Sequence, residues 1–226
     1  SCLFLLFSCS TKVRVVHQLD PGQNSHIVFI GNTFAERLQN YNYFEPLLHK
    51  SFPDRNLTVR NLGWSADEIN MQSRPLNFPS QDDYLAKLKA DIIFACYGLN
   101  EAFKGPDSLD SFKQQLSAYL QHIQQQKYNG NTSPELILVS PIAHEKLGGF
   151  LPDPELYTHA MQEVAKQLNV PFINLFEPTK KLEAAADSIT INGIHLNNSG
   201  YKAVSDIMAK SLGLPASTWE ADNYSV

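Results

Sequence analysis

The chain alternates short apolar runs with longer amphipathic stretches, and this alternation limits its fold. Strands are predicted over residues 26–30, 57–62, 91–97, 136–140 and 171–175. Helices are predicted over residues 34–50, 84–89, 108–126, 153–168 and 199–212. Several strand runs are almost wholly apolar, which is typical of parallel strands covered on both faces. The pattern predicts a three-layer α/β/α sandwich around a parallel five-stranded sheet.

Composition excludes several classes of protein. The 226 residues suffice for one buried core, and the formal charge of -5 argues against a nucleic-acid binder. No apolar run reaches the roughly 18 residues that span a bilayer. The three cysteines give no disulfide framework or metal motif. No GxGxxG or glycine-rich lysine loop follows the first strand, so a flavodoxin-like nucleotide binder is disfavoured and no cofactor is expected.

The first residues are typical of an export signal. Residues 1–9 end in Leu6-Phe7-Ser8-Cys9, which resembles a bacterial lipobox with Cys9 as the lipidated residue. A plain signal peptide is the alternative. We expect residues 10–25 to form a tether, residues 26–214 the domain and residues 215–226 a loose tail. The predicted location is periplasmic or cell-surface, with one lipid group attaching the domain peripherally to a membrane.

Three of the predicted strands end in a glycine followed by polar residues. These glycines are Gly31, Gly63 and Gly98, and a further polar segment around His195 precedes the last helix. Ligands of such sheets bind beyond the carboxyl ends of the strands, where glycine lets backbone N–H groups approach closely. The sequence therefore predicts one site built from these four segments.

The four segments, in this order, resemble the blocks of the SGNH (GDSL-type) hydrolases. The resemblance covers residues 26 to about 212 and implies a flavodoxin-like fold and hydrolysis of esters, commonly on lipids or acetylated sugars. Thr33 stands at the position of the family's nucleophilic serine. Gly63 and Asn100 match the oxyanion donors, through a backbone N–H and a side-chain amide. His195 matches the general base.

The sequence departs from the family pattern at several positions. Thr33 replaces serine, Asn32 replaces the neighbouring aspartate and Glu101 replaces the third-block acid. Asn192 stands where the family has the acid that orients the histidine. An asparagine in that role costs about 10⁴ in rate in a serine protease. Asp187 is the nearest carboxylate in sequence that could orient His195 instead.

Each candidate also has a purely structural interpretation. Thr33 has the sequence context of a helix N-cap, with Glu36 at the capping-box position. Asn100 could close a turn and His195 could be a structural histidine. As substrate-binding residues we predict Asn32, Trp64 and His144.

Trp64 offers an aromatic wall for a sugar or acyl group, although packing would also explain it. His144 follows the fourth strand and could equally be a surface residue.

Two functions from different classes follow. The first is an exported ester hydrolase that removes a small acyl group such as acetyl from a glycan or similar small-molecule ester, with Thr33 as nucleophile and His195 as base. The second is a catalytically impaired pseudo-esterase that binds a glycan or another partner in the same cleft, which the changes at Thr33 and Asn192 would explain.

Overall fold

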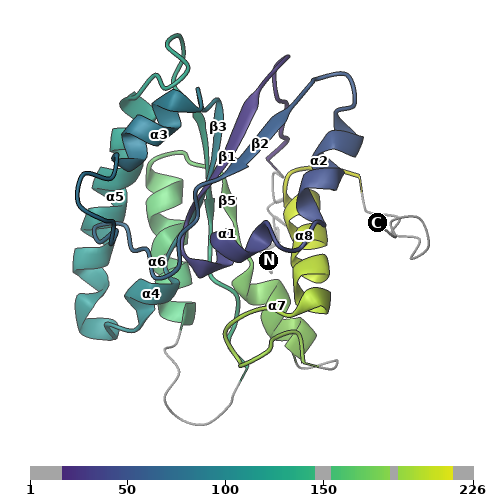
Figure 1. Cartoon of the computed structure of the whole chain (residues 1–226). Helices are drawn as coiled ribbons and strands as arrows, with labels where there is room; N and C mark the ends of the chain where they lie inside the picture. Colours follow the sequence, from purple (N-terminus) through teal and green to yellow (C-terminus); the bar gives the residue numbers. More distant parts are fainter. Residues whose placement is uncertain (1–16, 146–153, 184–187, 216–226) are drawn as a thin grey trace, which may run out of the picture.

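The computed structural model describes residues 17–145, 154–183 and 188–215, which form one parallel five-stranded sheet between two layers of helices (Figure 1). The strand order is β2-β1-β3-β4-β5. Their bounds are β1 His26–Gly31, β2 Thr58–Asn61, β3 Ile92–Cys96, β4 Glu135–Val139 and β5 Phe172–Ile173. This is the order of flavodoxin-like sheets, and it confirms the predicted α/β/α sandwich. The order reverses between β1 and β3, where such folds bind ligands.

The strands are apolar throughout because both faces of the sheet are covered. In β1, Ile27 and Phe29 join the core on one face, whereas Val28 and Ile30 join the core on the other. All four side chains are 2% exposed or less. Period-two burial on both faces explains why the sequence shows a continuous apolar run rather than an alternation.

Each face of the sheet has its own helical layer (Figure 1). One layer contains α1 Thr33–Leu38, α2 Phe44–Ser51, α7 Phe176–Glu183 and α8 Asn198–Ser211. The other contains α3 Gln81–Lys87, α4 Leu99–Ala102, α5 Leu109–Gln125 and α6 Pro154–Gln167, with the 3-10 turn η1 Pro106–Ser108 before α5.

The helix predicted over residues 34–50 is in fact two helices, so that prediction was wrong. Pro46 lies in the first turn of α2, where its missing N–H is tolerated. In one continuous helix the same proline would remove an internal hydrogen bond and clash with the preceding turn. The chain therefore leaves the helix after Leu38 and begins again at Phe44. The short helices α4 and α7 were not predicted.

Part of the predicted tether packs against the domain. Leu19 is 2% exposed within the core, and its N–H donates to the carbonyl of Leu212 at 3.1 Å. His17 contacts Glu135 at 2.6 Å. The predicted tether therefore does not extend freely to residue 25, because the apolar side chain of Leu19 is buried in the domain core. Cys9 and residues 10–16 lie outside the described residues, as does the tail beyond Pro215.

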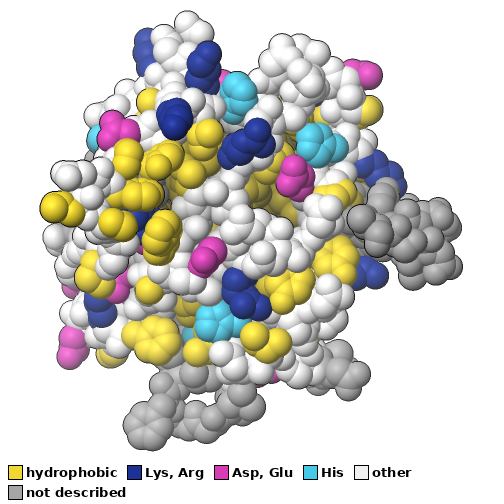
Figure 2. Space-filling model, viewed as in Figure 1, with side chains coloured by type: hydrophobic (Ala, Val, Ile, Leu, Met, Phe, Trp, Pro, Cys, Tyr) yellow, Lys and Arg dark blue, Asp and Glu magenta, His cyan; other side chains and the backbone are white. Residues whose placement is uncertain are grey.

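The surface carries mixed side chains. On the face seen in Figure 2, basic, acidic and apolar groups are interspersed. Within the described segments, we find no helix with the length and apolarity needed to cross a membrane.

Gly31 allows β1 and β3 to approach closely at their carboxyl ends. Its φ is 121°, and a Cβ added there would lie 2.0 Å from the carbonyl oxygen of Cys96. A larger residue would push these strand ends apart. The glycine thus brings the segment after β1 next to the segment after β3.

Candidate active site

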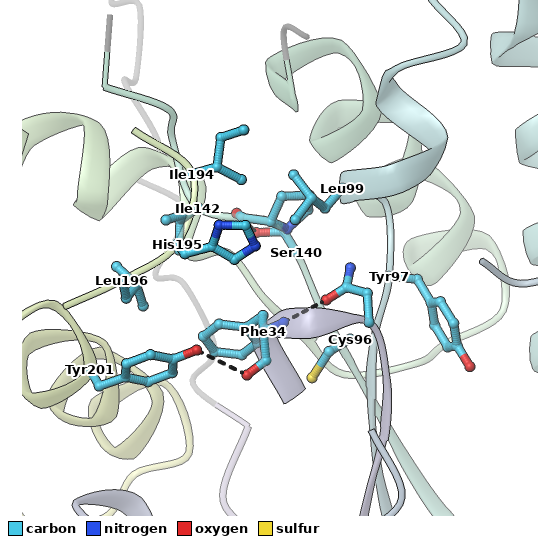
Figure 3. Close-up of a pocket in the computed structure, with 12 residues that line it drawn as sticks. Phe34, Cys96, Tyr97, Leu99, Ser140, Ile142, Ile194, His195, Leu196 and Tyr201 are labelled. Atoms are coloured by element: carbon cyan, nitrogen blue, oxygen red, sulfur yellow. Dashed lines mark hydrogen bonds between the residues drawn. The ribbon is translucent and has the colours of Figure 1, made fainter. Parts of the chain in front are cut away.

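A small cavity lies beyond the carboxyl ends of β1 and β3 (Figure 3). Its volume is about 20 Å³, enough for one water molecule. Asn32 and Phe34 from the start of α1 line it, together with Leu99 from α4 and His195. Figure 3 shows the imidazole ring of His195 reaching over the cavity toward Phe34. The structure therefore brings His195 to the segment that carries Thr33.

Thr33 is the first residue of α1, and it does not cap the helix. The N-cap is Asn32, whose Oδ1 accepts the N–H of Phe34 at 3.0 Å. The Glu36 carboxylate accepts a hydrogen bond from the Ser65 hydroxyl and does not complete a capping box. The capping interpretation of Thr33 was thus wrong by one residue. The Thr33 hydroxyl is not the helix cap, and the residue is partly exposed at the end of the sheet.

His195 is held by a tight loop before α8. The loop is closed by an antiparallel bridge between Thr190 and Leu196. The Glu145 carboxylate anchors it by accepting the N–H of Ile189 at 2.7 Å and the hydroxyl of Ser188 at 2.6 Å. Although burial opposes it, these hydrogen bonds hold the pKa of Glu145 below its usual value.

Asn192 occupies the position expected for an orienting group. Its Oδ1 accepts the backbone N–H of His195 at 2.9 Å and lies 3.1 Å from Nδ1 of the ring. Its Nδ2 lies 3.0 Å from the same Nδ1. Burial, and then the positive charge of Arg37, lower the pKa of His195. A neutral amide stabilises the imidazolium less than a carboxylate would.

We expect Asn192→Asp to raise any ester hydrolysis by at least about tenfold, because a carboxylate would accept the Nδ1 proton and stabilise the imidazolium. The backbone N–H of His195 would keep its acceptor. Steady-state kcat is the measurement, and Asn198→Asp, six residues along and exposed, is the matched control. An unchanged or lower kcat in Asn192→Asp would contradict this interpretation of the contact.

Gly63 packs directly against the first turns of α1. A Cβ added to it would lie 2.4 Å from the Glu36 nitrogen. Its own N–H donates to Oδ1 of Asn61 at 2.8 Å. The predicted oxyanion donor is therefore close to the Thr33 helix, and its hydrogen bond is directed at an asparagine side chain.

Asn100 lies on α4, and its side-chain amide is partly engaged. Nδ2 donates to the carbonyl of Asp67 at 2.9 Å. Because a primary amide has two N–H donors, one remains available for a ligand. The neighbouring Glu101 is 2% exposed and accepts the N–H groups of Ile69 and Gly98 at 3.0 and 2.9 Å. Burial raises its pKa.

A buried ion pair fixes the loop between β2 and α3. Asp67 has a 1% exposed side chain and accepts two hydrogen bonds from Arg74, at 2.6 and 2.7 Å. Burial raises the pKa of Asp67, and the Arg74 guanidinium opposes that rise. The pair holds the Asp67 carbonyl that orients Asn100.

We expect Arg74→Met to lower the free energy of unfolding by about 3–5 kcal/mol, because it leaves the buried Asp67 without its counter-ion. The loss should be greater at pH 8 than at pH 5, since the lone carboxyl gains a proton at lower pH. Urea unfolding measures both. Arg55→Met, which breaks an exposed pair with Asp20, should cost only about 0–1 kcal/mol. Equal losses in the two variants would contradict the prediction.

A larger groove of about 650 Å³ begins at Gly63. Trp64, Phe78 and Tyr84 line it together with Arg74 and Glu36. The Arg74 guanidinium lies 4.4 Å from the centre of the Trp64 ring, and Phe78 meets that ring edge-on at 5.9 Å. Trp64 remains 42% exposed, so it forms a wall of the groove and is not a core residue.

The other predicted residues have different outcomes. His144 follows β4 and is partly buried, but it does not line the cavity. Asp187 lies outside the described residues.

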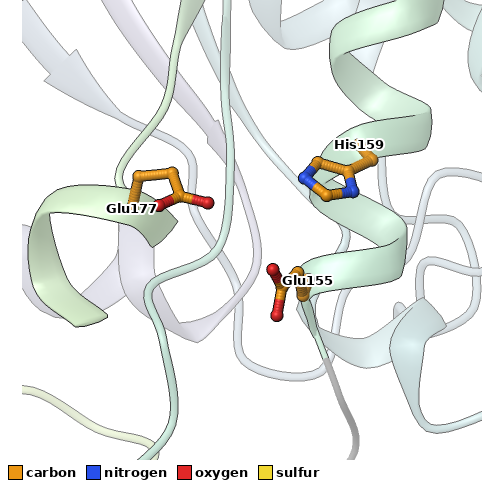
Figure 4. Close-up of side chains that lie close together, drawn as sticks. All are labelled: Glu155, His159 and Glu177. Atoms are coloured by element: carbon orange, nitrogen blue, oxygen red, sulfur yellow. The ribbon is translucent and has the colours of Figure 1, made fainter.

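Three side chains on α6 and α7 could contribute ligands to a divalent cation (Figure 4). Ligand atoms of Glu155, His159 and Glu177 lie within 4.8 Å of one another. The Lys180 ammonium lies 2.9 Å from Glu155 and already supplies a positive charge there. None of these residues lines the cavity with His195.

The family of the chain follows from a comparison with family models. The model of the GDSL-like lipase/acylhydrolase family matches residues 29–203. The chain belongs to this family. It is thereby placed among the ester hydrolases of SGNH type, as the four blocks predict. A search of curated protein sequences gave no match.

Solved structures of similar fold agree with this assignment. A GDSL-like lipase from Parabacteroides merdae has a TM-score of 0.70 and 13% identity, over 88% of this chain and 100% of that chain. An acetylxylan esterase from Geobacillus stearothermophilus has a TM-score of 0.66 and 14% identity, over 87% of this chain and 98% of that chain. At such identities the likeness shows the fold alone.

Two residues of the site were not predicted. Asn61 accepts the N–H of Gly63, and Arg37 places a charge near His195. Asn61 ends β2 directly before the Gly63 segment, so its position was visible in the sequence. Nothing in the sequence indicates that the Arg37 side chain turns toward α8.

Proposed function

We propose that the chain removes a small acyl group, such as acetyl, from a glycan or similar ester, with Thr33 as nucleophile and His195 as general base. The observation that carries this proposal is the cavity, where His195 meets the two residues that flank Thr33. In the proposed arrangement His195 takes the proton of the Thr33 hydroxyl, which caps no helix, and so activates it as an oxygen nucleophile.

The reaction proceeds in two acyl transfers. His195 takes the Thr33 hydroxyl proton as the oxygen attacks the acyl carbon. The tetrahedral oxyanion is stabilised by the N–H groups of Thr33 and Gly63 and by the Asn100 amide, and Asn61 must release the Gly63 N–H first. His195 then gives the proton to the leaving alcohol. Water then attacks the acyl group on Thr33 while His195 takes a proton from the water. The acid leaves, and His195 gives that proton to the Thr33 oxygen.

A small acyl group and a larger alcohol suit the available space. The cavity of about 20 Å³ admits little more than a methyl group, whereas the groove of about 650 Å³ is of ligand-binding size. Trp64 would stack on a sugar ring in that groove. The similar esterase from Geobacillus acts on acetylxylan and has catalytic mutants of a serine, an aspartate and a histidine, the last two three residues apart. Asn192 and His195 have the same spacing.

The second candidate is a pseudo-esterase that binds the same ligand without turnover. It is favoured by the Gly63 N–H, which is bonded to Asn61 at 2.8 Å, and by the uncharged Asn192 beside His195. In that case Thr33→Ser would create no activity, and binding would survive His195→Ala.

Acetate release from acetylated xylo-oligosaccharides and from 4-nitrophenyl acetate tests the proposal. We expect the protein to release acetate from both, and the double variant Thr33→Ala/His195→Ala to match the blank. Equal rates for the protein and the double variant would reject hydrolysis by these residues. Titration of the double variant with the oligosaccharide then separates a binder from a protein without this ligand.

We also propose that the protein is exported and attached to a membrane through lipid on Cys9, on the sequence of residues 1–9 alone. Metabolic labelling with a fatty acid tests this, and a Cys9→Ser variant should lose the label. Retention of the label in that variant would contradict lipidation at Cys9.

A further inference from the structure

Two stacked tyrosine rings, Tyr41 and Tyr201, connect Arg37 to the cavity that His195 lines. The Arg37 Nη2 donates to the Tyr41 hydroxyl at 3.1 Å. The Tyr41 ring stacks on Tyr201 at 4.3 Å, and the Tyr201 hydroxyl donates to the carbonyl of Phe34 at 3.3 Å. Tyr201 and Phe34 line the cavity together with His195. The Arg37 charge therefore stands at the His195 side of the site.

No acidic side chain among the described residues forms an ion pair with Arg37. Its polar partner is a neutral phenol, and its Nε is buried without a hydrogen bond. The other half-buried arginine near the site, Arg74, is paired with Asp67 through two hydrogen bonds. Arg37 as a whole is partly exposed, although its Nε is buried.

An unpaired cation at this place opposes catalysis as proposed above. His195 becomes an imidazolium in the transition state, and Asn192 offers it no negative charge. Arg37 adds a repulsive positive charge. A negative charge supplied by the substrate would pair with Arg37 and remove that repulsion at the moment of reaction.

We propose that the substrate of this site carries a carboxylate on its alcohol half, and that Arg37 binds it. This inference rests on the proposed ester hydrolysis. The alcohol half is indicated because its leaving oxygen must receive its proton from His195. In this arrangement the carboxylate lies on the Arg37 side of that oxygen, and the sugar ring lies on the side of the groove with Trp64. Planar guanidinium groups suit carboxylates, with which they form paired charge-assisted hydrogen bonds. An acylated sugar acid has this chemistry.

Two acetyl esters that differ only in charge test the proposal. 3-Acetoxybenzoate and 3-acetoxybenzamide have the same acyl group and similar phenol leaving groups. We expect kcat/KM of the protein to be at least about tenfold higher for the benzoate. In Arg37→Gln the ratio should fall to near one, mainly through KM of the benzoate, while the benzamide is hydrolysed faster. Arg37→Lys should keep part of the preference.

Arg55→Gln is the control, because Arg55 forms an exposed ion pair with Asp20. It should leave the ratio unchanged. A ratio near one in the unmodified protein, or a ratio that survives Arg37→Gln, would overturn the carboxylate proposal while ester hydrolysis stands. A preference for an anionic acyl half, tested with a 4-nitrophenyl hemisuccinate, would overturn the assignment to the alcohol half.

Binding separates this inference from the proposed function. If neither ester is hydrolysed, the proposed ester hydrolysis is wrong. Calorimetry with 3-hydroxybenzoate and 3-hydroxybenzamide then tests the carboxylate site by itself. Binding of the benzoate at least about tenfold more tightly, lost in Arg37→Gln, supports the carboxylate site. Equal binding of the two, or no binding, overturns it.

Discussion

Thr33→Ala is expected to reduce kcat for acetyl esters by at least about 10³, with little change in stability. The variant removes the hydroxyl of the first residue of α1, which lies between the two cavity-lining residues Asn32 and Phe34. Loss of a nucleophile in a serine protease leaves the oxyanion donors and binding intact, and the remaining rate is far below that of the complete enzyme. The helix should persist because its cap is Asn32.

Thr33→Ser separates a slowed enzyme from a binding protein. Serine keeps the hydroxyl and lacks the methyl that restricts χ1, so it should hydrolyse the ester at least as fast as threonine. Initial rates and thermal unfolding of the unmodified protein and the two variants are measured together. Activity that persists in Thr33→Ala would contradict the assignment of the nucleophile. Activity absent from both the unmodified protein and Thr33→Ser would favour the pseudo-esterase.

His195→Ala is expected to lower kcat by a similar factor, because the nucleophile and the leaving alcohol both lose their proton carrier. Burial and the Arg37 charge lower the pKa of His195. The base is active when neutral, so the acidic limb of kcat/KM against pH should have its midpoint below the usual value of about 6.5. Removing Arg37 should move that midpoint upward.

The control for this prediction is His49→Ala. His49 is exposed on α2 and pairs with Glu45 one turn earlier. It should leave both rate and pH profile unchanged. An acidic limb with a midpoint above 6.5, or one that stays in place in Arg37→Gln, would contradict the charge environment described for His195.

The sheet could be predicted from the sequence because its strands are buried on both faces. Apolar runs such as that from Ile27 to Ile30 have few alternatives to a parallel strand. The helices were harder to delimit because their ends depend on single residues. Pro46 divides one amphipathic stretch into α1 and α2. The four residues of α4 are too few to show a helical period.

The site could be predicted only in part. Gly31 at the end of β1, Gly63 after β2 and His195 were visible as motifs whose backbone or ring chemistry depends on residue type. The hydrogen bonds that already occupy these groups were not visible, because side-chain contacts such as that of Asn61 with the Gly63 N–H depend on the packed structure. The same holds for Arg37, which reaches the site through Tyr41 and Tyr201. Resemblance to a family gives the expected donors but not these neighbours.

The most direct test of the central claim, that His195 activates Thr33, is labelling with a fluorophosphonate followed by mass spectrometry. The reagent forms a stable bond only with an activated oxygen nucleophile. We predict one adduct per chain, located on Thr33 and absent from His195→Ala. An adduct on Ser65 or Ser140, labelling that survives loss of His195, or ester hydrolysis without any adduct would contradict the claim.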